Sequence, residues 1–179
     1  MTSSDTDASR PPGIGEPATD EDLRVLRTQL GRPARGVLGI AARCVCGRPT
    51  VVVTAPRLPD GTPFPTFYYL THPAATAAMS ALEATQVMPE LAALLEEPDV
   101  AAQYTTAHER YLADRESVDV VPEISGFSAG GMPTRVKCLH ALAAHSLATG
   151  PGVNPIGDIA LERSTWSPAR CQCVVDDAD

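Results

Sequence analysis

A single β-rich stretch lies between segments of helical character in this chain. Residues 36–70 hold three short runs with strand-like composition, 37–43, 50–54 and 66–70, and turn sequences with Gly and Pro separate them. Before and after this stretch, apolar residues recur at helical spacing. Strands and helices that are segregated along the chain are typical of the α+β class. We therefore predict an α+β fold in which a three-stranded antiparallel meander packs with about five to six helices.

Several segments have the start and stop signals of helices as well as the spacing. Thr19 and Asp22 are spaced as a capping box before the first segment, and Gly31 follows its last apolar residue. Asn154 and Pro155 form a start signal for the last segment. The predicted helices cover about 20–30, 73–84, 89–96, 98–117, 133–149 and 155–163.

The length of 179 residues fits one domain. Residues 1–18 are mostly Ser, Thr, Asp, Pro and Gly and offer little apolar surface to bury, so we predict a disordered N-terminal tail. One α+β domain is expected over residues 19–165. Residues 166–179 begin with Trp166 and show no periodic pattern, so we predict an irregular C-terminal tail there.

Charge and hydropathy exclude several classes of function. The net charge of −8 repels phosphate backbones and argues against general nucleic-acid binding. No apolar run approaches the roughly 18 residues that a membrane-spanning helix needs. Residues 1–7 carry acidic and hydroxyl groups rather than the basic and apolar regions of a secretory signal. We expect a cytoplasmic protein with no membrane span.

The five cysteines include two Cys-x-Cys pairs near the two ends of the predicted domain, Cys44 with Cys46 and Cys171 with Cys173. In an extended strand alternate side chains share a face, so each pair can present two sulfurs to one ion. Four thiolates make a tetrahedral zinc site, and Gly47 relieves crowding after the first pair. The alternative is that all these cysteines are reduced thiols, since cytoplasmic proteins keep few disulfides.

A glycine-rich loop precedes the predicted helix over 133–149. Free backbone N–H groups at a helix start attract anions, and cationic side chains in the first turns add to the attraction. We predict that a phosphate or carboxylate ligand binds at Gly130, Gly131, Arg135, Lys137 and His140. The alternative is a simple connector with two solvated surface charges, because the loop has no Walker motif.

Cys138 stands in the same predicted helix, two residues before His140. Side chains two residues apart on a helix point about 200° apart, so these two are not expected to share a metal ion. Cys138 and His145 point the same way but lie roughly 10.5 Å apart along the axis, which is also too far. We interpret both histidines as core-edge residues. Cys138 is either a small buried residue or a thiol activated by the helix start, and it is the reserve ligand for the zinc ion.

Four strings in the sequence carry a resemblance to a known family. They are LGRP at 30–33, RCVCG at 43–47, APRLPDGTPFPT at 55–66 and GMPTRVKCLH at 131–140. With these strings, residues 23–162 resemble the bacterial family called domain of unknown function 501. The resemblance implies no activity, because the family has no established reaction or catalytic residues.

The resemblance also implies a genomic setting. Genes of this family resemble neighbours of a cell-division septum protein and an exopolyphosphatase in actinobacterial genomes. The pair Cys171 and Cys173 lies outside the resemblance.

The sequence has no recognisable set of nucleophile, base and orienting group. We therefore expect a cytoplasmic binding or accessory protein that takes a small anionic, phosphate-bearing ligand at the glycine loop. The alternatives are an enzyme acting on a phosphorylated or carboxylated metabolite at the same loop, and a zinc-binding structural protein.

Overall fold

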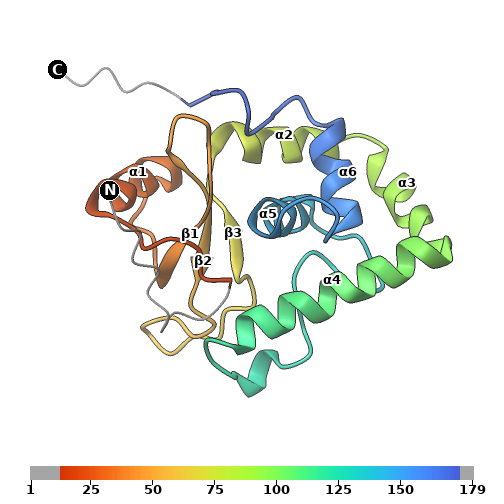
Figure 1. The fold of residues 1–179 in the computed structure, drawn as a ribbon, viewed down its shortest axis with the longest axis horizontal. Coiled ribbons are helices and arrows are strands. Elements are labelled where there is room, and N and C mark those ends of the chain that lie inside the picture. The colour runs from red at the N-terminus through yellow and green to blue at the C-terminus, as the bar shows by residue number, and fades with distance from the viewer. Residues whose placement is uncertain (1–12, 174–179) are drawn as a thin grey trace, which may run out of the picture.

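Six α-helices and a three-stranded sheet make up the part of the chain that the computed structural model describes, residues 13–173. Figure 1 shows the sheet toward one side of the molecule and most helices on the other. The predicted α+β class is confirmed. In chain order the elements are α1 (Asp20–Leu30), β1 (Val37–Arg43), β2 (Pro49–Thr54), β3 (Tyr68–Leu70), α2 (Pro73–Glu83), α3 (Val87–Ala93), η1 (Leu94–Glu96), α4 (Pro98–Glu116), η2 (Pro122–Ile124), α5 (Leu139–Thr149) and α6 (Pro155–Arg163).

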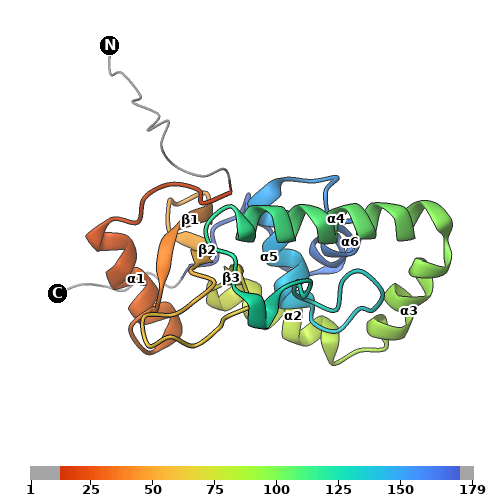
Figure 2. The ribbon, with the colours of Figure 1, turned by 90° about the horizontal axis from the view of Figure 1, so that it is seen from below.

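The sheet is an antiparallel meander with β2 between β1 and β3. Val52 of β2 pairs with Ile40 of β1 and with Tyr69 of β3. Alternate residues of a strand point to opposite faces. Val52 accordingly packs toward Leu26 of α1, whereas Val51 belongs to the main core on the other face. Figures 1 and 2 show α1 and the helical layer on opposite sides of the sheet.

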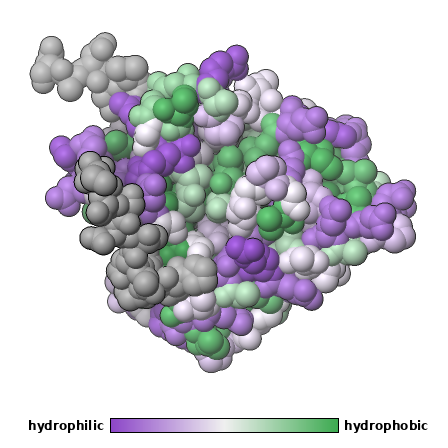
Figure 3. All heavy atoms as spheres, in the orientation of Figure 1, coloured by the Kyte–Doolittle hydropathy of each residue, from purple (hydrophilic) through white to green (hydrophobic). Residues whose placement is uncertain are grey.

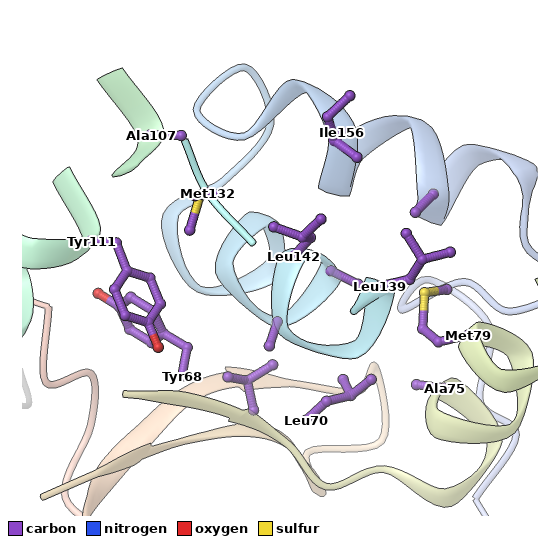
Figure 4. Close-up of a cluster of buried hydrophobic side chains, with 14 of the residues drawn as sticks. Tyr68, Leu70, Ala75, Met79, Ala107, Tyr111, Met132, Leu139, Leu142 and Ile156 are labelled. Atoms are coloured by element: carbon purple, nitrogen blue, oxygen red, sulfur yellow. The ribbon is translucent and has the colours of Figure 1, made fainter. Parts of the chain in front are cut away.

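Helix α5 is the centre of the main core (Figure 4). Leu139 and Leu142 of α5 are fully buried, and Leu142 packs in one cluster with Tyr68 of β3 and Ile156 of α6. Burial of a side chain of this size stabilises the fold by about 1.5–3 kcal/mol. Because neighbours surround α5, most of its residues are buried, not only one stripe. The sheet and α5 therefore form a rigid base for the residues at their ends.

The first helix begins at the predicted capping box. Thr19 accepts a hydrogen bond from the Asp22 backbone N–H, and the Asp22 carboxylate accepts one from the Thr19 backbone. The side chain of Arg43 on β1 donates to both Asp22 oxygens at 2.7 and 3.1 Å. This contact with Arg43 lowers the pKa of Asp22 to about 2. The capping box thus also fixes α1 against the sheet.

Parts of the two predicted tails lie within the described residues and contact the rest of the fold. Ile14 is buried, and Glu16 exchanges two backbone hydrogen bonds with Ile40, at 2.8 and 2.7 Å. Trp166 is only 2% exposed and lies beside His72. The remainder of the two predicted tails, 1–12 and 174–179, lies outside the described residues.

Helix α5 begins at Leu139, so the prediction that it starts at Pro133 is wrong. The preceding residues instead fold back on the glycine-rich loop. The backbone N–H of Arg135 donates to the Gly131 carbonyl, and that of Lys137 donates to the Gly130 carbonyl. Because these residues bond to the loop, Cys138 becomes the N-cap residue of α5.

The long helix α4 carries two buried charged residues, Asp114 and Arg115. Arg115 is 1% exposed and donates to the backbone carbonyls of Ile124 and Phe127. Asp114 is also buried and accepts a hydrogen bond from the Tyr68 hydroxyl. Buried charges require such partners, and here they hold the loop after α4 against the core.

Hydrophobic and hydrophilic residues alternate over the face of the molecule seen in Figure 3. In the described part of the chain, no helix combines the length and the apolar character that crossing a bilayer requires.

Candidate metal centre

The turn between β1 and β2 carries the first cysteine pair. The backbone N–H of Cys44 donates to the Arg48 carbonyl at 2.9 Å, and that of Gly47 donates to the Cys44 carbonyl at 2.8 Å. Gly47 has a φ of +88°, a conformation that favours glycine. These bonds bend the chain tightly between Cys44 and Arg48. Cys44 is buried under the turn and Cys46 is exposed at its surface.

The segment after α6 carries the second pair back to this turn. Trp166 lies against His72, with ring centroids 5.5 Å apart. The backbone N–H of Val45 then donates to the Pro168 carbonyl at 3.2 Å. In Figure 1 this blue segment passes α2 toward the β1–β2 end of the sheet. Packing and a backbone hydrogen bond therefore place Cys171 and Cys173 beside the turn.

Four sulfur atoms from two segments far apart in the sequence meet at this place. The Sγ atoms of Cys44, Cys46, Cys171 and Cys173 all lie within 4.8 Å of one another. The shortest separation described, between Cys46 and Cys173, is 3.4 Å. In a tetrahedral zinc site with Zn–S bonds of about 2.3 Å, sulfur atoms are about 3.8 Å apart. The cluster therefore has the size of a four-thiolate zinc centre.

Cys46 and Cys173 differ in how readily they lose a proton. Partial burial opposes ionisation of Cys46, but hydrogen bonds from the Arg48 backbone and from the other three thiols lower its pKa to about 7. Burial and the hydrogen bonds with Cys46 and Cys44 raise the pKa of Cys173. One thiolate forms readily, and each further one meets the repulsion of the first. Full ionisation of the cluster therefore calls for a cation.

His72, the N-cap residue of α2, contacts the cluster through its ring. Its Nδ1 accepts a hydrogen bond from the Ala75 backbone N–H, so the ring proton lies on Nε2. Nε2 is 3.1 Å from the Sγ of Cys173 and donates to it. Burial lowers the pKa of His72 and keeps the ring neutral. The sequence gave no signal for this contact.

Among the described residues a second group of potential ligands lies at the start of α5. Glu83, Cys138 and His140 have their ligand atoms within 4.8 Å of one another. The expectation that Cys138 and His140 point apart is wrong, because Cys138 precedes the helix. Its Sγ lies 3.8 Å from the Nδ1 of His140. Glu83 comes from the end of α2, and the sequence offered no motif that includes it.

The predicted anion site has a different geometry from the one expected. Arg135 and Lys137 lie before α5, and the first backbone N–H of the helix, at Leu139, donates to Glu83 Oε1 at 2.6 Å. The carbonyls of Gly130 and Gly131 accept hydrogen bonds from the backbone of the same loop. The Glu83 carboxylate therefore already accepts the hydrogen bond of one backbone N–H at the start of the helix. Anion binding at this loop stays a prediction.

These features define a small α+β protein with a cluster of four thiols and a mixed cluster of thiol, imidazole and carboxylate. The family model described as "Protein of unknown function (DUF501)" matches residues 40–162. The chain belongs to this family, as the sequence resemblance indicated. No curated protein and no solved structure matches it. The match includes Cys44 and Cys46 and also Glu83, Cys138 and His140, and it ends before Cys171.

Proposed function

We propose that this protein binds one zinc ion through Cys44, Cys46, Cys171 and Cys173, and that the ion is structural. The observation that carries the proposal is the convergence of these four sulfurs within 4.8 Å. Two pairs separated by most of the sequence do not meet by local geometry. The core and the contact of the Trp166 ring with His72 bring them together.

The donor atoms support zinc over other ions. Thiolates are soft ligands that prefer zinc to magnesium or calcium, and four of them complete a tetrahedral site. A site with four protein ligands has no open position, which is typical of structural zinc. The His72 N–H directed at Cys173 is the kind of outer hydrogen bond that orients metal ligands.

The centre would close a long loop. Cys46 lies at the tip of the β1–β2 turn and Cys171 follows the last helix, so one ion joins the sheet to the end of the described chain. Metal-binding free energy becomes folding free energy when the ligands come together only in the folded state. This role agrees with a binding or accessory protein whose C-terminal segment is held in place by the metal.

A disulfide is the main chemical competitor for these thiols. The 3.4 Å between the sulfurs of Cys46 and Cys173 is well beyond an S–S bond of about 2.05 Å, and all five cysteines are free. Alkylation of the denatured protein without reductant should therefore label all five. Fewer labelled thiols in freshly purified protein would indicate disulfides in place of metal.

The direct test compares zinc content by elemental analysis. The full chain with Cys46→Ser and Cys173→Ser should hold about one zinc equivalent less than the wild type. Cys138→Ser, which changes the cysteine outside the cluster, is the control in a cobalt experiment that reports the four-thiol site alone. Loaded with Co²⁺, it should keep the absorption spectrum of a tetrahedral four-thiolate site. Equal zinc content in the wild type and the double variant would refute the proposal.

A further inference from the structure

The group at the start of α5 has an arrangement that the four-thiol cluster lacks. We infer that Glu83, Cys138 and His140 form a second zinc site, with three different protein ligands and one coordination position left open. This inference does not depend on the four-thiol centre, because the two groups share no residue.

The ligand atoms are already close enough to share an ion. His140 Nδ1 lies 3.2 Å from Glu83 Oε1 and 3.8 Å from Cys138 Sγ, and all three atoms lie within 4.8 Å of one another. Neighbouring ligands around a zinc ion with bonds of about 2.0–2.3 Å are roughly 3.3–3.8 Å apart. No large movement is needed to bring these atoms to one metal.

Hydrogen bonds outside the group orient two of the ligands. His140 Nε2 lies 3.2 Å from the Thr76 carbonyl oxygen, which can only accept, so Nε2 carries the proton. Nδ1 faces Glu83 and Cys138 and can offer its lone pair to an ion that lies between them. The Leu139 N–H fixes the Glu83 carboxylate by donating to Oε1. A histidine that donates its other ring N–H to a backbone carbonyl is the usual arrangement of a metal ligand.

A divalent ion would balance the charges of this group. A lone pair on Nδ1 that faces a carboxylate at 3.2 Å is repelled unless a positive charge lies between them. Either a proton on Nδ1 or a metal ion can supply that positive charge. A zinc ion balances the carboxylate and the thiolate together, while the imidazole stays neutral.

The open position gives this site a different chemistry from the first. Three protein ligands leave one position for water or a ligand, which is typical of catalytic zinc. The side chains of His140 and Glu83 are 26% and 28% exposed, so solvent reaches the group. Zinc lowers the pKa of a bound water and polarises a bound carbonyl. The site would accept a small molecule that offers one oxygen or sulfur donor.

Zinc content and thiol labelling test this site separately from the first. His140→Gln should hold about one zinc equivalent less than the wild type, whatever the four-thiol cluster binds. His108→Gln is the matched control, because His108 is a partly buried histidine that contacts Ser128 outside the group. In the wild type, zinc should also slow the alkylation of Cys138 by iodoacetamide, located by peptide mapping.

Two results would overturn the inference. One is equal zinc content in the wild type and in His140→Gln. The other, measured on the wild type alone, is rapid alkylation of Cys138 at a rate that zinc does not change. That rate would indicate a thiolate paired with a protonated His140 and no metal. A failure of the four-thiol centre would appear instead in the Cys46→Ser and Cys173→Ser variant, so the two failures are distinguishable.

Discussion

The two cysteine-containing clusters differ in how the sequence encodes them. The four-thiol cluster consists of two pairs, and each pair is visible as Cys-x-Cys. The cluster at α5 has one cysteine, one histidine two residues later and a carboxylate from another helix, Glu83. The first is closed and all-sulfur, whereas the second is mixed and partly open. A repeated local motif thus identifies half-sites, and a site of unlike ligands is visible only in the folded chain.

The largest expected effect follows from changing the buried member of the four-thiol cluster. Cys44→Ser should abolish zinc binding there and lower the free energy of unfolding by about 3–5 kcal/mol, because it removes a metal ligand and buries a hydroxyl. Denaturant unfolding with and without a chelator measures this. The chelator should destabilise the wild type and leave Cys44→Ser nearly unchanged. If the chelator changes neither protein, the metal does not stabilise the fold.

The buried histidine in the middle of α5, His145, should make the free energy of unfolding sensitive to acid. Burial, with a smaller effect of Arg110, lowers the pKa of His145 to about 4. In the unfolded chain that pKa is about 6.5. Between these values the unfolded state binds more protons, so stability is complete above pH 6.5 and falls as the pH approaches 4. The loss attributable to His145 is about 3 kcal/mol.

The variant His145→Gln isolates this contribution. Its unfolding free energy should fall less steeply than that of the wild type between pH 6.5 and 4, as followed by denaturant unfolding at several pH values. His108→Gln, which changes a less buried histidine, is the control. An unchanged pH dependence in His145→Gln would mean that this imidazole is not held neutral by the core.

A smaller effect is expected at the histidine behind the four-thiol cluster. Asparagine at position 72 can still cap α2, but it loses the N–H directed at Cys173 and the ring beside Trp166. His72→Asn should therefore weaken zinc binding about 10- to 100-fold, as loss of outer hydrogen bonds usually does. Competition with a chromophoric chelator measures the affinity. Wild-type affinity in His72→Asn would show that the sulfur contact has no part in metal binding.

The smallest effect concerns the turn glycine. Gly47→Ala forces alanine into a φ of +88° with no neighbouring atom in the way, so the cost is about 1 kcal/mol of backbone strain. Gly61→Ala is a matched control with a φ of +86° and equally open surroundings in the loop between β2 and β3. Both should lower stability alike in thermal unfolding, but only Gly47→Ala should weaken zinc binding. Equal zinc affinities of the two variants would mean that the conformation of this turn does not affect metal binding.

Local signals account for what the sequence predicted correctly. The caps at Thr19 and Asn154 fixed the starts of α1 and α6, because a side-chain hydrogen bond to the next turn needs only neighbouring residues. The strand-like composition of the runs within 36–70 likewise predicted the sheet, although β3 begins only at Tyr68.

Tertiary contacts explain what the sequence left out. Helix α5 begins later in the sequence than predicted, because the backbone before it forms hydrogen bonds with Gly130 and Gly131. Cys138 therefore precedes the helix. The Glu83 carboxylate accepts a hydrogen bond from Leu139, which lies 56 positions later in the sequence. Hydrophobic periodicity cannot predict a contact over that separation. The predicted tails contained Ile14 and Trp166, two apolar residues whose partners lie elsewhere in the fold.

The nearest neighbours of the bound zinc test the central claim most directly. X-ray absorption at the zinc edge, on the full chain with His140→Gln to remove the second site, reports those neighbours. The account predicts four sulfur atoms at about 2.3 Å. A signal with nitrogen or oxygen among the nearest neighbours, or a protein that retains no zinc, would contradict it.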